Sequence, residues 1–370
     1  MVAMRRVVLL VLGGCCVLQA SAEPWRFMVA GDSRGSDNGV NTTILGEIAD
    51  EALAWDVAFF LFTGDLVNGQ TNQAALESQF LTWRDTLQPL YDAGIGVYPV
   101  RGNHDVGDPP GLTAWNNVFS GGYALPQNGP AGEVNITFSF EHENALIVGL
   151  DEYVLRHRVN QSWLDQQLDD NQRVHVFVFG HEAAFSVLHS DCLDDYASAR
   201  NTFVDSIVDA RGRTYFCAHD HFYDHAVADD DHKPSNDLHQ FLAGTAGAPL
   251  YDWDGNYLGN NSPYTVTNAY HSRAYGYLLV EVDDITVTLR FMQRSGAGHY
   301  VPVEEWSYQP VWPCRGDLDR DYAVGLSDLA ILLGHYGESD AGYYDGDLDG
   351  DGDVDLADLS LMLAYYGQSC

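Results

Sequence analysis

Basic residues are scarce in this chain. Its 370 residues include 18 Lys or Arg against 53 Asp or Glu, so the formal net charge at pH 7 is −35. Binding along a nucleic-acid backbone requires clustered Lys and Arg, and the composition therefore argues against it. The acidity indicates a solvated surface suited to saline water, a capacity to bind cations, or both.

Long apolar runs are missing beyond residue 22. No later stretch approaches the ~20 apolar residues that a helix needs to cross a bilayer, so no transmembrane segment is expected. Before that point, the basic Met1–Arg6 and the apolar Val7–Leu12 precede Ala20-Ser21-Ala22, the pattern of a secretory signal peptide over residues 1–22. Leu12–Cys15 offers an alternative, a lipoprotein processing site. Both predict an exported protein that is secreted, periplasmic or held at the cell surface.

Cysteine is sparse as well, with six residues, two of them in the predicted signal peptide. Four remain after its removal, an even number that suits an oxidising compartment. Cys314 and Cys370 bracket the C-terminal segment and form a natural pair, and Cys192 would then pair with Cys217 by elimination. The alternative for Cys217, inside an apolar strand, is a buried small hydrophobic residue.

Apolar residues are abundant, at 46% of the chain, and support a substantial core. Short apolar runs at 26–30, 57–62 and 96–100 alternate with helical patterns at 41–55 and 73–92, which predicts a βαβαβ unit. We expect a long loop at 109–130. Further strands are expected at 136–140, 145–150, 174–179 and 214–218, and the runs 241–247 and 275–291 are expected to complete a second, more antiparallel sheet. The prediction is an α/β fold over residues 23–300, with two packed sheets and helices outside, an α/β/β/α sandwich.

Several of these strands end in residues that bind metals or move protons. Parallel strands joined by helices bring their carboxyl ends to one edge of a sheet, so side chains far apart in the sequence converge there. Divalent Mn, Fe or Zn accepts mixed carboxylate, imidazole and amide-oxygen ligands, and a bridging carboxylate can hold two such metals about 3.5–4 Å apart. The strand ends that supply this set are Gly31-Asp32-Ser33-Arg34, Gly64-Asp65, Gly102-Asn103-His104-Asp105, Gly180-His181 and Ala218-His219-Asp220-His221.

Together these motifs resemble the calcineurin-like metallophosphoesterase superfamily over about residues 25–295. The resemblance implies a first metal on Asp32, Asp65 and His221, and a second on Asp65, Asn103, His181 and His219, with Asp65 bridging. It also implies hydrolysis of phosphate mono- or diesters by a metal-bridging hydroxide, with His104 as proton donor to the leaving group. Asp105, next to His104 in the motif, is a further candidate catalytic residue.

The chain departs from the family pattern at two positions. Arg34 stands where the family often has a first-metal histidine, which predicts fewer protein ligands and weaker occupancy at that metal. Ala218 replaces the glycine before the histidine pair. Because guanidinium forks match phosphate oxygens, Arg34 and Arg101 are both candidates for contact with the substrate phosphate.

The C-terminal segment contains an internal repeat after a predicted linker over 301–313. Carboxylates recur at loop positions 1, 3, 5 and 12, a spacing that wraps oxygens around Ca²⁺, and each loop precedes a short apolar helix. Tyr322 occupies the position that Gly352 fills in the second loop, so the first site departs from the pattern. The pair resembles a type I dockerin, a small all-α domain over 314–370, which implies a cohesin-like partner or another surface attachment. The expected Ca²⁺ ligands are Asp317, Asp319, Asp321 and Asp328, then Asp347, Asp349, Asp351 and Asp358.

The sequence thus predicts an exported, dinuclear-metal phosphoesterase attached through a Ca²⁺-binding module. The rival prediction is a non-catalytic surface or scaffold-binding protein, in which the metal site only stabilises the fold. His104 favours the enzyme, because stability alone does not need a proton donor at that place.

Overall fold

The structure is a computed structural model that describes residues 24–107, 111–230, 237–310, 316–319, 323–339 and 341–368. The predicted signal peptide, Cys314, Cys370 and Asp321 lie outside the described residues. Among the residues described, no helix has the length and apolar character that crossing a bilayer requires.

The βαβαβ unit predicted at the start of the domain is present. The strands β1 (Trp25–Ala30), β4 (Phe59–Phe62) and β5 (Gly96–Pro99) pair in parallel, and α1 (Thr42–Ala54), α2 (Gln73–Thr86) and α3 (Gln88–Asp92) connect them. The apolar run in β4 is continuous because it is buried on both sides. Phe59 stacks on Phe27, whereas Phe62 meets Trp83 of α2 at a ring-centroid distance of 5.1 Å.

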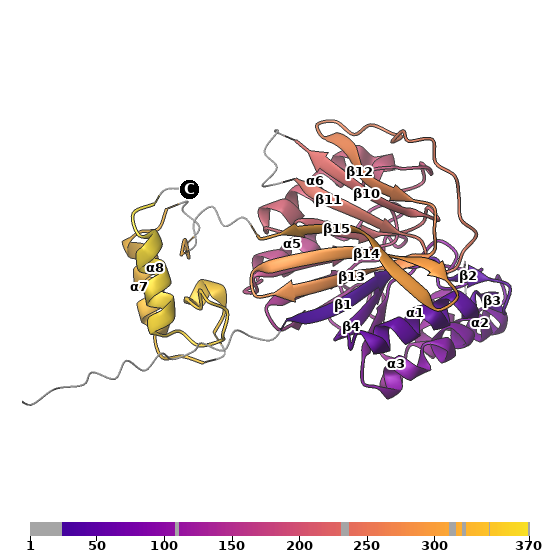
Figure 1. The fold of residues 1–370 in the computed structure, drawn as a ribbon, viewed down its shortest axis with the longest axis horizontal. Coiled ribbons are helices and arrows are strands. Elements are labelled where there is room, and N and C mark those ends of the chain that lie inside the picture. Colours follow the sequence, from indigo (N-terminus) through magenta and orange to yellow (C-terminus); the bar gives the residue numbers. More distant parts are fainter. Residues whose placement is uncertain are drawn as a thin grey trace, which may run out of the picture.

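Two sheets pack face to face (Figure 1). The first has six strands in the order β15-β14-β13-β1-β4-β5, and the second has seven in the order β12-β10-β11-β9-β8-β7-β6. Aromatic rings fill the space between them, as where Phe27 of β1 meets Phe177 at 4.9 Å. The remaining strands are β6 (Phe138–His142), β7 (Ala145–Gly149), β8 (His175–Phe179), β9 (Thr214–Cys217), β10 (Tyr223–Asp229), β11 (Leu238–Ala243), β12 (Thr265–Ser272), β13 (Gly276–Asp283), β14 (Thr286–Gly296) and β15 (His299–Tyr308), with a small hairpin of β2 (Arg34–Gly35) and β3 (Gly39–Val40).

Helices cover the outer faces of both sheets. Buried residues of α1, α2 and α3 belong to the core of the first sheet, and those of α5 (Gln161–Asp169) and α6 (Ala197–Asp209) pack on the second. The mixed α/β fold with helices outside two sheets agrees with the prediction for a metallophosphatase domain.

Three expectations about the chain path are wrong. The 275–291 run joins the first sheet, not the second, because β13 pairs antiparallel with β1. The linker predicted from 301 is a strand up to Tyr308: β15 lies at the sheet edge, where Pro302 needs no ladder partner on its free side. The loop predicted over 109–130 contains α4 (Gly111–Val118), whose Trp115 packs on Phe80 of α2.

The disulfide expected between Cys192 and Cys217 is also wrong. Both residues are free cysteines, and both are buried. Burial raises the pKa of each thiol above its usual value, so both stay protonated. Cys217 is therefore the buried small hydrophobic residue of the alternative interpretation.

The C-terminal segment forms two helices, α7 (Leu326–His335) and α8 (Leu356–Tyr365), with a small core of their own. The two halves interlock through short backbone contacts, as where Gly337 N donates to Val354 O and Val324 N donates to Gln368 O. This segment touches the larger domain where Tyr343 N donates to Gln172 O at 3.2 Å.

Candidate metal centre

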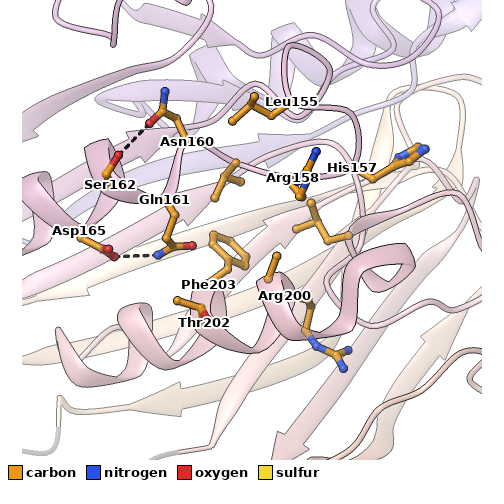
Figure 2. A pocket seen from close by; sticks show the side chains of 13 residues that line it. Leu155, His157, Arg158, Asn160, Gln161, Ser162, Asp165, Arg200, Thr202 and Phe203 are labelled. Carbon is orange, nitrogen blue, oxygen red and sulfur yellow. Dashed lines mark hydrogen bonds between the residues drawn. The ribbon is translucent and has the colours of Figure 1, made fainter.

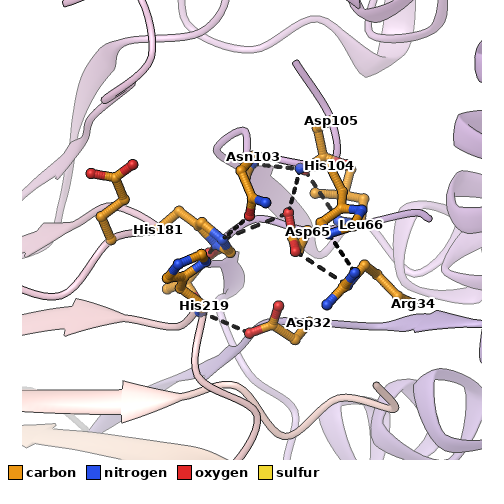
Figure 3. Close-up of polar contacts among 12 residues, drawn as sticks. Asp32, Arg34, Asp65, Leu66, Asn103, His104, Asp105, His181 and His219 are labelled. Atoms are coloured by element: carbon orange, nitrogen blue, oxygen red, sulfur yellow. Dashed lines mark hydrogen bonds and ion pairs between the residues drawn. The ribbon is translucent and has the colours of Figure 1, made fainter. Parts of the chain in front are cut away.

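The predicted ligands lie together at the carboxyl ends of the central strands (Figure 3). Asp32 follows β1, Asp65 follows β4, and His219 follows β9, and all three have positive φ, of 59°, 51° and 74°. Left-handed backbone is uncommon for residues with a Cβ and is concentrated at functional sites. At these strand ends it turns the chain sharply, and the turns are bonded to one another: Asp32 N donates to Gly64 O, and Ser33 N to Asp65 O.

The glycines that precede two ligands are required by close approach. A Cβ on Gly102 would lie 2.2 Å from Asp65 Oδ1, and a Cβ on Gly64 would lie 2.6 Å from His181 Nδ1. Ala218 fits at the third position because its methyl group faces Gly31, which has no side chain. The departure from glycine at Ala218 thus leaves the strand end intact.

The first predicted ligand set is assembled. Asp32, Asp65 and His221 each bring one ligand atom within 4.8 Å of the others, a possible metal site, and all three are buried. Asp32 Oδ1 lies 3.5 Å from His221 Nε2. Asp32 Oδ1 and Asp65 Oδ2 are buried and accept no hydrogen bond from any described residue. Buried carboxylate oxygens without a donor are costly unless a cation is near.

The second predicted set is assembled around His181. Its Nε2 lies 3.3 Å from Asn103 Oδ1 and 3.6 Å from Asp65 Oδ1, and its ring centroid is 5.2 Å from that of His219. Acid, amide and imidazole donors of this kind suit a divalent transition metal. Asp65 belongs to both sets, as a bridging carboxylate must.

Backbone carbonyls fix the orientation of two imidazoles. His181 Nδ1 donates to Thr63 O at 2.7 Å, and His221 Nδ1 donates to Pro249 O at 2.8 Å. A carbonyl can only accept, so Nδ1 carries the proton in each ring and Nε2 presents a lone pair to the centre. Sequence reasoning missed these partners, because any residue type supplies a carbonyl.

Arg34 lies inside the first ligand set. Its Nη2 contacts His221 Nε2 at 2.6 Å, its Nη1 contacts His104 Nε2 at 2.5 Å, and its Nε lies 3.2 Å from Asp65 Oδ2. The predicted residue is thus at the centre, with its guanidinium against the ligands.

His104 is held at the rim of the centre. Its backbone N donates to Asp65 Oδ1 at 2.9 Å, and its Nδ1 donates to Asn68 O at 2.8 Å. The ring therefore turns Nε2 inward, where a proton donor to a leaving group belongs.

Two predicted catalytic residues, Asp105 and Arg101, are bonded to other parts of the protein. Asp105 is fully buried and accepts from the backbone N of Leu66, Val67 and Gly102, so it holds the loop that carries Asn103 and His104. Arg101 is buried and donates from Nε to Asp151 Oδ2 at 2.7 Å. The charge of Arg101 is thus directed into the protein and the carboxylate of Asp105 is bonded to backbone, so their contact with substrate stays a prediction.

The charges of the centre favour a bound cation. Burial raises the pKa of Asp32, but His221, His181 and Arg34 outweigh it, and the net pKa lies below its usual value. Burial lowers the pKa of His181, which keeps its lone pair available. Burial also lowers the pKa of His219, but Asp191, Asp220 and nearby carboxylates outweigh it and raise it to about 9. The nearby carboxylates thus outweigh burial at His219, whereas burial outweighs them at His181.

Other residues support the ligands without having been predicted. Glu152 is buried and accepts from the backbone N of His181 and of Glu182. Tyr251 stacks on His221 at 4.1 Å, and Asp191 Oδ1 lies 3.5 Å from His219 Nε2. None belongs to a motif, and their distance from the motifs along the chain left no signal in the sequence.

A separate cavity of about 510 Å³ lies between α5 and α6 (Figure 2). Its lining includes Arg158, Asn160, Gln161, Arg200 and Phe203, and none of the predicted site residues. It is not part of the metal centre.

The acidic loops of the C-terminal segment also gather carboxylates. Asp317, Asp319 and Asp328 form one group whose ligand atoms lie within 4.8 Å of one another, and Asp347, Asp349 and Asp351 form another. Asp358 lies outside the second group by this measure, but its Oδ1 accepts from the backbone N of Leu348 and Asp349. Asp328 repeats this pattern with Leu318 and Asp319.

Comparison with known proteins assigns a family to part of the larger domain. Residues 26–223, more than half of the chain, match the family of calcineurin-like phosphoesterases, and the chain belongs to this family. No curated protein sequence gives a significant match. The family supports a hydrolase.

Three solved structures share the fold at low identity. A purple acid phosphatase from yellow lupin (Lupinus luteus) is 13% identical with a TM-score of 0.56, and the match covers 78% of this chain but 54% of that one. PhoD is 10% identical with a TM-score of 0.56 and coverage of 79% and 70%. GAP50, the anchor in the inner membrane complex of Plasmodium, is 15% identical with a TM-score of 0.54 and coverage of 78% and 90%. At such identities the likeness shows the fold alone.

Proposed function

We propose that this chain is a metal-dependent phosphoric ester hydrolase. The observation that carries the proposal is the convergence of Asp65, Asn103 and His181, with His181 Nε2 within 3.6 Å of both oxygens. A divalent metal held there supplies Lewis-acid polarisation of phosphoryl oxygens and a nucleophile at neutral pH. Mono- and diesters of phosphate are both candidate substrates.

The chain's own residues divide the remaining work. Arg34 places a guanidinium charge at the centre, and this charge attracts phosphoryl oxygens. His104 Nε2 faces the centre because Asn68 O binds the other ring nitrogen, and the doubly protonated ring would give its Nε2 proton to the departing alkoxide and return to the neutral form. Asp105 keeps His104 in place through the backbone it binds.

Activity of the full chain tests this proposal. Protein stripped with a chelator and reloaded with Mn²⁺, Fe²⁺ or Zn²⁺ is assayed on p-nitrophenyl phosphate and on its bis-ester. Turnover with at least one metal is expected, and Asp65→Asn should lose both turnover and metal. Glu141→Gln, at an exposed pair with Arg173, is the matched control and should retain both. Absence of turnover with all three metals would overturn the proposal.

We further propose that the protein is exported and that the C-terminal segment is a Ca²⁺-binding, dockerin-like attachment module. Residues 1–22 have the pattern of a signal peptide, and the repeated acidic loops support Ca²⁺ binding. Apolar side chains recur on the exposed side of both helices, with Leu326 at 74% and Leu356 at 64% exposure, which suits a protein partner such as a cohesin-like domain. Pull-down of a cohesin domain in Ca²⁺ but not in EGTA tests the module.

The second candidate function is a non-catalytic surface protein. The observation that favours it is Arg34, which contacts two of the imidazoles that chemistry would use. GAP50, described as an anchor, has the same fold. Metal binding without turnover of either ester would support this candidate.

A further inference from the structure

The two ligand sets of the metal centre differ in the groups that lie opposite their donor atoms: other electron-pair donors in the second set, and the Arg34 guanidinium in the first. In the second set, His181 Nε2, Asn103 Oδ1 and Asp65 Oδ1 are all electron-pair donors, because Thr63 O holds the only proton of the neutral His181 ring. Acceptors that face one another at 3.3 and 3.6 Å need a cation between them. This convergence of donor atoms suits a metal.

In the first set the lone pairs already face a cation. His221 Nε2 accepts from Arg34 Nη2 at 2.6 Å, and Asp65 Oδ2 is paired with Arg34 Nε at 3.2 Å. A ring nitrogen that accepts a hydrogen bond cannot give the same lone pair to a metal. Arg34 Nη1 contacts His104 Nε2 at 2.5 Å, so the guanidinium is held at both ends.

The position and charge of Arg34 suit a fixed cation at the first ligand set. A guanidinium remains charged at every pH at which a protein is folded. Its side chain is 14% exposed, and it follows Ser33, whose Oγ donates to Leu66 O and ties the turn to the loop after β4. The cation is therefore built into the turn that carries Asp32.

We propose that Arg34 takes the place of the first of two metals, so that the centre holds a single exchangeable divalent metal on Asp65, Asn103, His181 and His219. The inference deepens the proposed function, because it sets how many metals that activity uses. It concerns metal stoichiometry, which is measured independently of turnover. Asp32 Oδ1, which has no hydrogen-bond donor among the described residues, is the oxygen that removal of Arg34 would leave for a second metal.

Mn²⁺ binding to the full chain tests the proposal. The acidic C-terminal loops are filled with excess Ca²⁺, Mn²⁺ is titrated by calorimetry, and the loaded sample is measured by electron paramagnetic resonance. Two Mn²⁺ about 3.5–4 Å apart give a spin-coupled signal that a single ion cannot give. Wild-type protein should bind one Mn²⁺ at the centre without coupling, and Arg34→His should bind two with coupling.

Controls separate the charge of Arg34 from general damage. Arg173→His, at the exposed pair with Glu141, should bind one Mn²⁺ as wild type does. Arg34→Ala removes the guanidinium without adding a ligand and should admit a second, weaker Mn²⁺. A coupled pair in wild-type protein, or one ion only in both folded Arg34 variants, would overturn the inference. One Mn²⁺ without turnover would instead contradict the proposed hydrolase and leave the inference standing.

Discussion

Arg101 Nε donates to Asp151 Oδ2 at 2.7 Å, and both side chains are buried, at 4% and 0% exposure. This pair joins the end of β5 to the end of β7, one strand from each sheet, directly behind the loop that carries His104. A buried pair is costly to break because one charge is left without a partner.

We therefore expect Arg101→Met to destabilise the larger domain by about 3–5 kcal/mol, measured by urea unfolding. Glu141→Ala, at the exposed pair with Arg173, is the control and should cost at most ~1 kcal/mol. Unchanged stability with a loss of substrate affinity in Arg101→Met would support the substrate contact predicted from the sequence.

His104→Ala should lower kcat while metal content stays constant. General-acid catalysis contributes about 10²–10⁴-fold, and the loss should be larger for phenyl phosphate than for p-nitrophenyl phosphate, whose leaving group needs less protonation. His299→Ala, at an exposed position on β15, should leave kcat unchanged. Equal losses on both esters, or loss of metal, would contradict the role of proton donor.

The stability of the larger domain should depend on His175. This imidazole is buried and bonded to Asp284 O at 2.7 Å, and burial lowers its pKa from 6.5 to about 4. The unfolded chain binds this proton below pH 6.5 and the folded chain does not, so stability falls as pH drops from about 6.5 to about 4. The loss of unfolding free energy over this pH range is about 3 kcal/mol, because one pKa unit corresponds to about 1.36 kcal/mol.

His175→Gln should remove this contribution to the pH dependence of stability. Urea unfolding of both proteins across this pH range should show a steeper loss for wild type, and the difference between the two curves isolates His175 from other groups. Parallel curves would mean that the imidazole is protonated in the folded protein.

Removal of Ca²⁺ should reverse the pH dependence of the C-terminal segment. Burial, with Asp358 and Asp351 nearby, raises the pKa of Asp349 to about 6, and burial raises that of Asp347 to about 6. Both exceed the unfolded value of 3.8, so the Ca²⁺-free fold binds protons and becomes more stable as pH falls from about 6 to about 4.

With Ca²⁺ bound the opposite is expected, because protons then compete with the ion for the same carboxylates. Calorimetric melting in Ca²⁺ and in EGTA at several pH values measures both trends. Identical pH trends in the two buffers would exclude Ca²⁺ from these loops.

The strands that carry the site were predictable because the buried apolar residues of each strand are consecutive in the sequence. The runs 26–30 and 57–62 are apolar throughout, and the βαβ rule then places Asp32 and Asp65 at one edge. β10 was missed because Asp224 and His225 lie in its buried stretch, and their partners are distant: Tyr257 bonds Asp224, and Glu304 bonds His225. Partners so far along the chain leave no local pattern.

The residues of the site were likewise predictable only in part. The residue types and their order predicted which side chains meet, and the structure brings these side chains together. The place of the Arg34 guanidinium, between two imidazoles, depends on a rotamer and on neighbours from three other strand ends. The burial of Arg101 was unpredictable for the same reason, since Asp151 is fifty positions away.

The left-handed backbone at Asp32, Asp65 and His219 lowers the stability of the fold, whereas it aims their polar groups at the proposed metal centre. Asparagine or glycine relaxes such a position, so replacing Asp65 with Asn would ease its φ of 51° and remove a buried charge. A selection for heat resistance alone, without selection for turnover, would therefore drift toward amides and glycine at these strand ends. We therefore expect the carboxylates and the imidazole at these strand ends to serve the metal centre rather than the stability of the fold.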